Sequence, residues 1–495
     1  RLGICSEGIG SPAINASIAA FLLLLIYQGR AISQAQESES PNIVLIMADD
    51  LGWKDLHCYG PEPLDTPHLD QLAREGMRFT DFYAGCTVCR PSRLSLWTGK
   101  HMGHTPISSN ASYHFKPEDV TVAELLKGAG YRTGGVGKWA MGGVETSGFP
   151  LKNGFDFWMG YLDQGQAHNY YPTHLWRNGQ KYPLPGNVLS DHPRARGRVA
   201  SRKVTWSHPV MTEEAFAFIR ESGSQPFLLH VHWTIPHANN EGGRVHGDGM
   251  EVPDYGVYKE QDWVNTSKGQ AAMVSWMDRD VGRLVDPLRE LKLDRRTLVV
   301  FTSDNGPWLL YGDHAGSARP LREGKGTNFE GGFRVPCVMR WPGTIPPRSV
   351  CSEIAGTIDL FPTFAALADA SLPPHKIDGK DILPLMTAEL GAKTPHEYFY
   401  HYDGAHRLMA VRGGKWKLMF AQSYNSPEGG EEGMPGKGVR KELELSLFDL
   451  ESDIGETTNL AGKYPQVVKR LEAAAERMRA DLGDGARAGP GRRFE

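Results

Sequence analysis

This sequence lacks a long apolar run and a strong excess of charge, and these two absences limit the classes of protein to which it can belong. The 495-residue chain has no apolar run of about 20 residues, the length that a membrane-spanning helix requires, and its apolar stretch at 16–27 is too short. It also has no strong excess of charge, because 54 basic and 58 acidic side chains leave a formal net charge of −4. This balance provides no overall attraction to nucleic acid or to a membrane surface. Any affinity for anions must therefore come from a local cluster of basic side chains.

The stretch 16–27 is typical of the hydrophobic region of a signal peptide, because small and polar residues follow it. We expect residues 1–35 to be a signal peptide that is cleaved near Ser33 or Ala35, and the mature protein to be periplasmic or secreted. An uncleaved membrane anchor is the alternative. No cysteine directly follows the stretch, which argues against a lipid anchor. We therefore expect neither a stable membrane anchor nor a nucleic-acid partner.

Four predicted strands end in polar side chains. The strands are expected at 42–47, 131–138, 226–232 and 297–303, and their composition favours a buried parallel sheet. The polar residues at or just after their ends are Asp49, Asp50, Lys138, His237, Asp304 and Asn305. In an open α/β sheet the carboxyl ends of parallel strands lie at one edge, where ligands bind. Asp49 and Asp50 repel each other, so a bound cation would stabilise the pair, although a solvated turn is the alternative.

The segment 86–99 holds the most specific motif of the chain. Its fixed positions are Cys89, Pro91, Ser92, Arg93, Leu96, Thr98 and Gly99. This pattern resembles the signature of the type I sulfatases. In that family a separate formylglycine-generating enzyme oxidises the cysteine of the motif to formylglycine, the catalytic aldehyde. A redox or disulfide pair of Cys86 with Cys89 is the alternative, but it does not account for the residues that follow.

Other segments between residues 41 and about 460 resemble the same family. The segment 137–142 is similar to its Gly-Lys-Trp-His-Leu-Gly motif, 303–306 to its Ser-Asp-Asn-Gly motif, and 321–336 to its Gly-Lys and Glu-Gly-Gly-x-Arg-x-Pro segments. One position departs from the pattern, since Ala140 stands where the family has a histidine that contacts the formylglycine. The candidates to replace this histidine are His168, His314 and hydroxide.

The resemblance implies a set of site residues. The implied catalytic residues are Cys89, Arg93, Lys138, His237, Asp304 and Lys325. The implied metal ligands are Asp49, Asp50, Asp304, Asn305 and the oxygen of the modified Cys89. These are hard oxygen donors, and the sequence has no Cys/His cluster with zinc spacing, so Ca²⁺ is favoured and Mg²⁺ is the alternative. In the implied mechanism the hydrated formylglycine attacks sulfur, Asp304 activates it, and His237 protonates the leaving oxygen while basic groups stabilise the sulfate.

The resemblance also implies the fold. We expect an α/β, alkaline-phosphatase-like large domain at 41–385, with a mostly parallel central sheet sandwiched by helices. A small C-terminal α+β domain with an antiparallel sheet is expected at 386–485, with a hairpin at 409–420 and an amphipathic helix at 465–482. The stretch 423–441, rich in Gly, Glu and Lys, is predicted to be mobile.

The sequence specifies the substrate less well. Gln166, His168 and the aromatic residues up to position 178 form a polar and aromatic cluster that suits a carbohydrate, although an ordinary loop has the same composition. His314 is a third candidate for substrate contact. We expect hydrolysis of a sulfate ester, on a carbohydrate or an aryl group, to an alcohol and inorganic sulfate. The alternatives are a phosphonate or phosphodiester hydrolase of the same superfamily and a non-catalytic glycan-binding protein with an unmodified Cys89.

Overall fold

The computed structural model describes residues 40–60, 64–312, 316–428, 433 and 436–491. The predicted signal peptide at 1–35 and the candidate residue His314 lie outside these residues. From Pro41 onward the chain forms one compact unit. Among its described helices, none combines the length and the apolar character needed to cross a bilayer.

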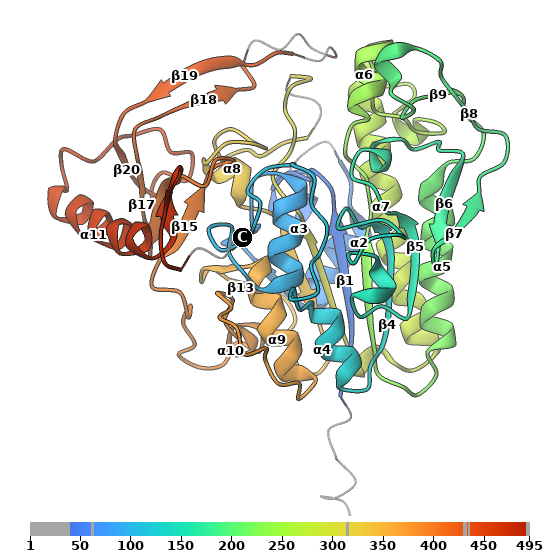
Figure 1. The fold of residues 1–495 in the computed structure, drawn as a ribbon, viewed down its shortest axis with the longest axis horizontal. Helices are drawn as coiled ribbons and strands as arrows, with labels where there is room; N and C mark the ends of the chain where they lie inside the picture. Colours follow the sequence, from blue (N-terminus) through green and yellow to red (C-terminus); the bar gives the residue numbers. More distant parts are fainter. Residues whose placement is uncertain (1–39, 61–63, 313–315, 429–432, 434–435, 492–495) are drawn as a thin grey trace, which may run out of the picture. The chain divides into compact units, whose positions relative to one another are not determined.

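A ten-stranded sheet forms the centre of this unit, in the order β13-β2-β12-β11-β1-β10-β4-β5-β6-β7 (Figure 1). The strands are β1 (Asn42–Ala48), β2 (Met77–Phe79), β4 (Arg132–Lys138), β5 (Phe157–Tyr161), β6 (His174–Arg177), β7 (Gln180–Pro183), β10 (Phe227–His232), β11 (Thr297–Ser303), β12 (Cys337–Arg340) and β13 (Ser349–Cys351). The central strands from β11 to β5 are parallel, whereas β12, β6 and β7 pair antiparallel with their neighbours. The predicted mostly parallel sheet is therefore confirmed.

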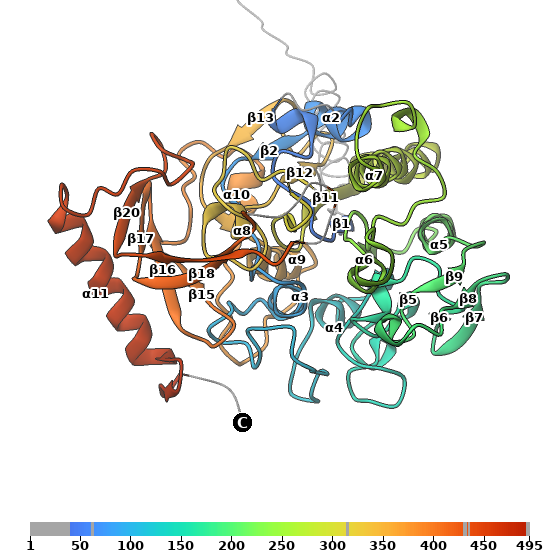
Figure 2. The same ribbon diagram turned by 90° about the horizontal axis from the view of Figure 1, so that it is seen from above.

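Helices cover both faces of the sheet, as Figure 2 shows for α3 and α4 on one side of β1 and α2 and α7 on the other. The helices are α2 (Pro67–Glu75), α5 (Ser207–Glu221) and α7 (Asn265–Glu290) on one face, and α3 (Cys89–Thr98), α4 (Val122–Gly128) and α9 (Leu360–Leu367) on the other. Alternate side chains of β1 pack into the two cores, with Val44 and Ile46 in the first and Ile43 and Leu45 in the second. The unbroken apolar run of β1 is typical of a strand that is buried on both faces.

Local signals explain where several helices begin. Before α4, the Thr121 hydroxyl accepts a hydrogen bond from the Glu124 N–H at 3.2 Å, and the Glu124 carboxylate accepts one from the Thr121 N–H at 2.7 Å. This reciprocal cap satisfies two N–H groups that the first turn of a helix leaves unpaired. The helix α2 likewise begins at Pro67, whose missing N–H costs nothing at a first helical position.

The C-terminal region is an antiparallel sheet covered by a helix. The sheet consists of β15 (Phe399–Tyr402), β16 (Leu408–Gly413), β17 (Trp416–Met419) and β20 (Ser446–Asp449), and the helix is α11 (Pro465–Leu482). The predicted hairpin and terminal helix are confirmed. The prediction of a mobile stretch at 423–441 is wrong at both ends, because β18 (Gln422–Ser426) and β19 (Val439–Leu443) pair as an antiparallel ribbon. Composition did not reveal that Tyr424 of this ribbon packs edge-on against Phe329, 4.9 Å between ring centroids.

Shorter elements complete the fold. They are β3 (Phe82–Tyr83) paired with β14 (Ala355–Gly356), β8 (Val188–Leu189) paired with β9 (Ala200–Arg202), β21 (Gly483–Asp484) paired with β22 (Arg487–Ala488), and the helices α6 (Asn240–His246), α8 (Glu330–Phe333) and α10 (Leu383–Met386). The strands β8 and β9 lie in the segment between β7 and α5, on the same side of the molecule as α6 (Figure 1).

Candidate active site

The polar ends of four parallel strands meet at one edge of the central sheet. Asp49 and Asp50 follow β1, Lys138 ends β4, and a short loop leads from β10 to His237. Asp304 and Asn305 follow β11, and all these side chains are buried. The strands are neighbours in the order β11-β1-β10-β4 and run parallel, so their carboxyl ends coincide.

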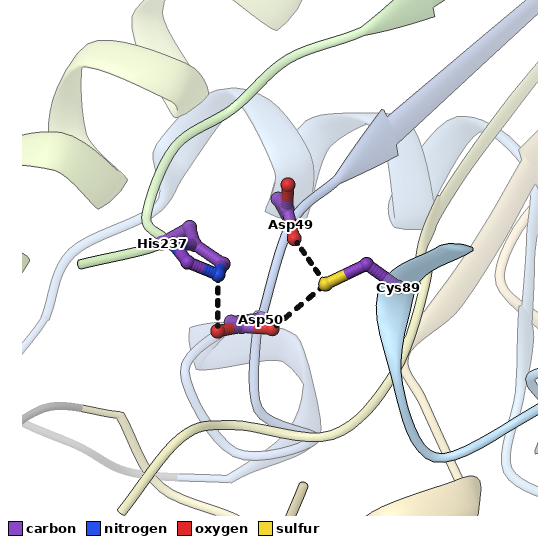
Figure 3. Close-up of side chains that lie close together, drawn as sticks. All are labelled: Asp49, Asp50, Cys89 and His237. Atoms are coloured by element: carbon purple, nitrogen blue, oxygen red, sulfur yellow. Dashed lines mark hydrogen bonds and ion pairs between the residues drawn. The ribbon is translucent and has the colours of Figure 1, made fainter. Parts of the chain in front are cut away.

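Cys89 enters this edge from the helix layer, as the first residue of α3. Its Sγ lies 3.3 Å from Asp49 Oδ1 and 3.9 Å from Asp50 Oδ1 (Figure 3). It also lies 3.2 Å from Lys325 Nζ, so the sulfur stands between two carboxylates and an ammonium group. Burial and the charge of Asp49 raise the pKa of the Cys89 thiol well above its ordinary value. The unmodified side chain is therefore a protonated thiol at neutral pH, which is a poor nucleophile.

Three basic side chains pair with the three carboxylates of the cluster. Lys138 Nζ lies 2.6 Å from Asp49 Oδ2, and Lys325 Nζ lies 2.5 Å from Asp50 Oδ1. Arg93, also on α3, places Nε 2.9 Å from an oxygen of Asp304. Burial raises the pKa of Asp49, but Lys138, His237 and Arg93 together hold it well below its ordinary value. Asp49 is therefore ionised despite its complete burial.

Asp304 differs from Asp49 in its protonation. Burial and the charge of Asp49 raise the pKa of Asp304 to about 7, and this effect outweighs that of Arg93. Its carboxylate accepts a hydrogen bond from the Asp50 N–H at 3.2 Å, and its carbonyl accepts one from the Ser92 hydroxyl at 2.5 Å. A carboxyl group with a pKa near neutrality can exchange a proton during a reaction.

His237 faces Asp50 across the cluster. Its Nδ1–H donates to the Ala238 carbonyl oxygen at 2.6 Å, so Nε2 carries the lone pair of the neutral ring. Nε2 lies 3.4 Å from Asp50 Oδ2, and burial lowers the pKa of His237 to about 3 (Figure 3). Two electron-rich atoms thus face each other, an arrangement that a cation or a proton between them would stabilise.

The residues present fit a bound metal ion. Ligand atoms of Asp49, Asp50, Cys89 and His237 all lie within 4.8 Å of one another. Asn305 donates from Nδ2 to Asp50 at 2.7 Å, while its buried Oδ1 has no hydrogen-bond partner among the residues that the structure describes. A buried oxygen without a partner is costly. Carboxylates and an amide oxygen are the ligands that hard divalent cations prefer, so the cluster is consistent with a metal site.

A second histidine lies beside His237. The ring of His168, in the short 3₁₀ helix Gln166–His168, stacks on that of His237 with centroids 4.6 Å apart and an angle of 18°. Its Nδ1 lies 3.2 Å from an oxygen of Glu241 at the start of α6. Burial raises the pKa of Glu241, but His168 and Arg198 lower it to about 2. An ionised Glu241 therefore fixes the orientation of the His168 ring.

A model of the family Sulfatase matches residues 41–370. The chain belongs to the sulfatase family. A second model, for the C-terminal region of aryl-sulfatase, matches residues 394–488, and a third, for the C-terminal part of N-sulphoglucosamine sulphohydrolase, matches 324–430. The family expected from the motifs is confirmed, and this sulfatase is an arylsulfatase-like hydrolase of sulfate esters.

Known relatives of this sulfatase cover nearly its whole length. Arylsulfatase A of Homo sapiens is 34% identical, covering 95% of this chain and 92% of that protein. N-acetylgalactosamine-6-sulfatase of Canis lupus familiaris is 31% identical, with the same coverage of 95% and 92%. A solved structure of Ps i-CgsB in complex with k-i-k-neocarrahexaose is 27% identical and covers 89% of this chain and 93% of that one, with a TM-score of 0.72.

Some residues that the sequence predicted lie away from the cluster, and two residues in or beside the cluster were not predicted. Gln166 is exposed and lines an open pocket to which no residue of the cluster contributes, whereas Tyr170 and Tyr171 belong to the buried core. His232, whose Nδ1 lies 3.1 Å from Arg93 Nη1, was missed, although its place at the end of a buried strand was a usable signal. Glu241 was also missed, and no pattern in the sequence pointed to it.

Proposed function

We propose that this sulfatase hydrolyses a sulfate ester on a carbohydrate and that Cys89 acts after conversion to formylglycine. The supporting observation is the position of the sulfur, between Asp49 and Asp50 and 3.2 Å from Lys325 Nζ, at the edge where the basic groups gather. A buried thiol with a raised pKa is poorly suited to attack there. A hydrated aldehyde at the same position would present a hydroxyl group to the same partners.

The basic side chains are proposed to bind the sulfate group. Arg93, Lys138 and Lys325 are all buried or nearly so, and each now compensates a carboxylate. Asp49, Asp50, Asp304 and Asn305 would hold a divalent cation, for which we propose Ca²⁺, with Mg²⁺ as the alternative. When bound, the ion supplies positive charge for sulfate oxygens and for an ionised hydroxyl. Its charge would offset the carboxylates, so that the lysines and the arginine are available to the anion of the substrate.

Two groups are proposed to move protons. Asp304, with a pKa of about 7, accepts the proton of the attacking hydroxyl, and Arg93 keeps its carboxylate in place. His237 donates a proton to the leaving alcohol oxygen. Burial holds the pKa of its ring at about 3, and the negative charge of a bound sulfate raises it, because an adjacent anion favours the protonated imidazole.

The carbohydrate substrate and the export of the protein are also proposals. Ps i-CgsB, with a TM-score of 0.72, was solved with a neocarrahexaose, and one relative is named for its action on N-acetylgalactosamine-6-sulfate. A substrate of this kind suits an extracytoplasmic enzyme, and the stretch 16–27 supports a signal peptide.

The decisive experiment has two readouts on one preparation. The protein is expressed together with a formylglycine-generating enzyme, and the peptide that contains position 89 is analysed by mass spectrometry. We expect the mass of the aldehyde and turnover of 4-nitrophenyl sulfate well above that of bis(4-nitrophenyl) phosphate. Full sulfate turnover with an intact thiol would contradict the formylglycine, and a preference for the phosphodiester would favour the alternative hydrolase.

A further inference from the structure

An open pocket of about 550 Å³ is lined largely by the segments that follow β4 and β5. Three of its lining residues are close chain neighbours of site residues. Arg90 directly follows Cys89, Ala140 lies two positions after Lys138, and Gln166 lies two positions before His168. Arg90 Nε donates to the Ala140 carbonyl oxygen at 3.1 Å, which ties two of these walls together. The walls of the pocket are therefore continuous in the chain with the segments that carry the reacting groups.

The lining has the chemistry of a sugar site. Its volume lies within the range of roughly 300–1,000 Å³ that is usual for small-molecule pockets. Tyr113 and Trp176 contribute half-buried aromatic rings, and Gln166 and His114 contribute polar groups. Aromatic rings pack against the apolar faces of pyranoses while polar tips bind their hydroxyl groups. These residues come from three separate segments that only the folded chain brings together.

The charges of the lining disfavour an anionic ligand. Among the described residues that line the pocket, Asp163 and Glu145 are exposed carboxylates, and Arg90 is the only lysine or arginine. The guanidinium of Arg90 already donates to the carbonyl oxygens of Asn110, Ala111 and Ala140. Outside the lining, Arg198 lies 3.8 Å from Asp163 and offsets part of that charge. A sulfate or carboxylate in this pocket would thus face two carboxylates and a single guanidinium that already donates to three backbone carbonyl oxygens.

Position 140 shapes the boundary between the pocket and the cluster. Ala140 has a φ of 67°, in the left-handed region, and carries only a methyl group where the similar family motif has an imidazole. Ala140 also lines the pocket. The methyl group of Ala140 occupies little space, so a sulfated sugar at the cluster and a neighbouring sugar in the pocket could be linked past it.

We propose that this pocket is a subsite for an uncharged sugar unit next to the sulfated one. The substrate is then an oligo- or polysaccharide in which a neutral pyranose adjoins the unit that bears the sulfate ester. This inference rests on the proposed function, because a subsite is defined by the reaction beside it.

The test uses a glycine that can be enlarged without strain. A Cβ at Gly143 would meet no atom within 4 Å, and its backbone lies outside the left-handed region, so Gly143→Leu fills the pocket and preserves the chain path. Gly462 is equally open and does not line the pocket, so Gly462→Leu is the matched control. The measured quantity is kcat/KM for a sulfated oligosaccharide with a neutral neighbouring unit, divided by kcat/KM for 4-nitrophenyl sulfate.

We expect this ratio to fall at least tenfold in Gly143→Leu and in Trp176→Ala and to stay within twofold of the wild type in Gly462→Leu. Thermal unfolding of each variant checks that it is folded. An unchanged ratio in both pocket variants would overturn the subsite. A wild-type preference for substrates whose neighbouring unit carries a carboxylate or a sulfate would overturn its neutral character.

A binding measurement separates the subsite from the proposed function. Saturation-transfer NMR with the desulfated neutral oligosaccharide needs no turnover, and we expect its signal to weaken in Gly143→Leu and to persist in Gly462→Leu. If the wild type binds this ligand but hydrolyses no sulfate ester, the proposed function fails and the subsite stands. Equal signals in both variants would overturn the subsite whatever the enzyme hydrolyses.

Discussion

Two buried clusters of this molecule contain the same charges and have different consequences. The active-site cluster consists of Asp49, Asp50, Asp304, Arg93, Lys138 and Lys325. The second, which we call the seam cluster, lies where the catalytic region meets the C-terminal sheet and consists of Asp81, Glu330, Glu456, Arg334, Arg412 and Lys417. Each combines three acidic with three basic side chains.

The seam cluster joins two parts of the chain. Lys417 on β17 lies 2.9 Å from an oxygen of Glu330 and 2.8 Å from one of Glu456, and Arg412 on β16 lies 2.5 Å from Asp81. Burial raises the pKa of Glu456 to about 7, much as it does for Asp304 in the active-site cluster. A perturbed carboxyl pKa therefore occurs in both clusters and does not by itself identify a catalytic site.

The features that distinguish the active-site cluster are chemical and positional. A cysteine stands inside it, and its three aspartates follow the ends of parallel strands. The ion pairs of the seam cluster instead join strands of the C-terminal sheet to α8 and to loops. We therefore expect substitutions in the first to remove activity and substitutions in the second to remove stability.

The largest expected effect is that of Cys89→Ala. We expect turnover of 4-nitrophenyl sulfate to fall at least roughly a thousandfold, because the reacting group is lost. The free energy of unfolding, from urea denaturation, should change by less than about 2 kcal/mol, since the side chain removed is small. A variant that keeps more than about a hundredth of the activity would contradict the role of position 89.

Lys417→Met should have the largest effect on stability. Removing this ammonium leaves Glu456 buried without its basic partner and Glu330 with its arginine partners only, and breaking a buried pair typically costs about 3–5 kcal/mol. The matched control is Lys415→Met, because Lys415 pairs with Asp449 at the surface, where solvent screens the pair and its loss should change stability much less. Equal urea midpoints for the two variants would show that the seam cluster does not stabilise the fold.

Ca²⁺ should stabilise the folded protein by binding in the active-site cluster, and this effect should not depend on the seam cluster. At a hundredfold excess over its dissociation constant, a ligand of the native state adds about 2.7 kcal/mol to the free energy of unfolding. We expect this increase, measured by urea denaturation after EDTA treatment and readdition of Ca²⁺, in the wild type and in Lys417→Met. If Ca²⁺ produced the same increase in a double variant with Asn305→Ala and Asp50→Ala, the proposed ligands would be contradicted.

The seam cluster should make stability depend on pH through Glu456. Its pKa is raised from 4.5 to about 7 in the folded protein, so between these values the native state binds more protons than the unfolded one. Stability from this group is then present below pH 4.5 and is lost as the pH rises through 7, by about 3 kcal/mol. Glu456→Gln removes the titration, so its free energy of unfolding should decline less than that of the wild type from pH 5 to 8. Parallel curves would disprove this dependence.

His168→Ala should have the smallest of these effects, a loss of turnover somewhat above tenfold, equivalent to about 1.4 kcal/mol. The reason is its stacking on His237, which orients that ring and can supply the histidine missing at Ala140. The control is His192→Ala, because His192 is exposed. An unchanged steady-state rate would show that His168 does not take this role.

Most of the fold could be predicted because its signals are local. The apolar runs of β1 and β11 and the amphipathic pattern of α11 each specify an element through neighbouring residues, and their boundaries agree with the structure within a few positions. The ribbon of β18 and β19 was missed because its strands are polar, and they are stabilised by pairing and by contacts such as that of Tyr424 with Phe329.

The residues of the candidate site likewise fall into those that local sequence patterns could identify and those that they could not. Cys89, Lys138 and Asp304 could be singled out because each belongs to a short motif or ends an apolar strand. Glu241 could not, because its importance comes from its contact with His168, which lies far from it in the sequence.

The order of residues along the chain was enough to indicate the family, the parallel sheet and the groups able to bind sulfate, because short motifs and periodic apolar runs encode them. Folding in three dimensions was needed to pair each charge, to leave the amide oxygen of Asn305 without a partner and to form the pocket beside Ala140. The physical reason is that burial and charge pairing depend on contacts between residues far apart in sequence, which no local pattern records.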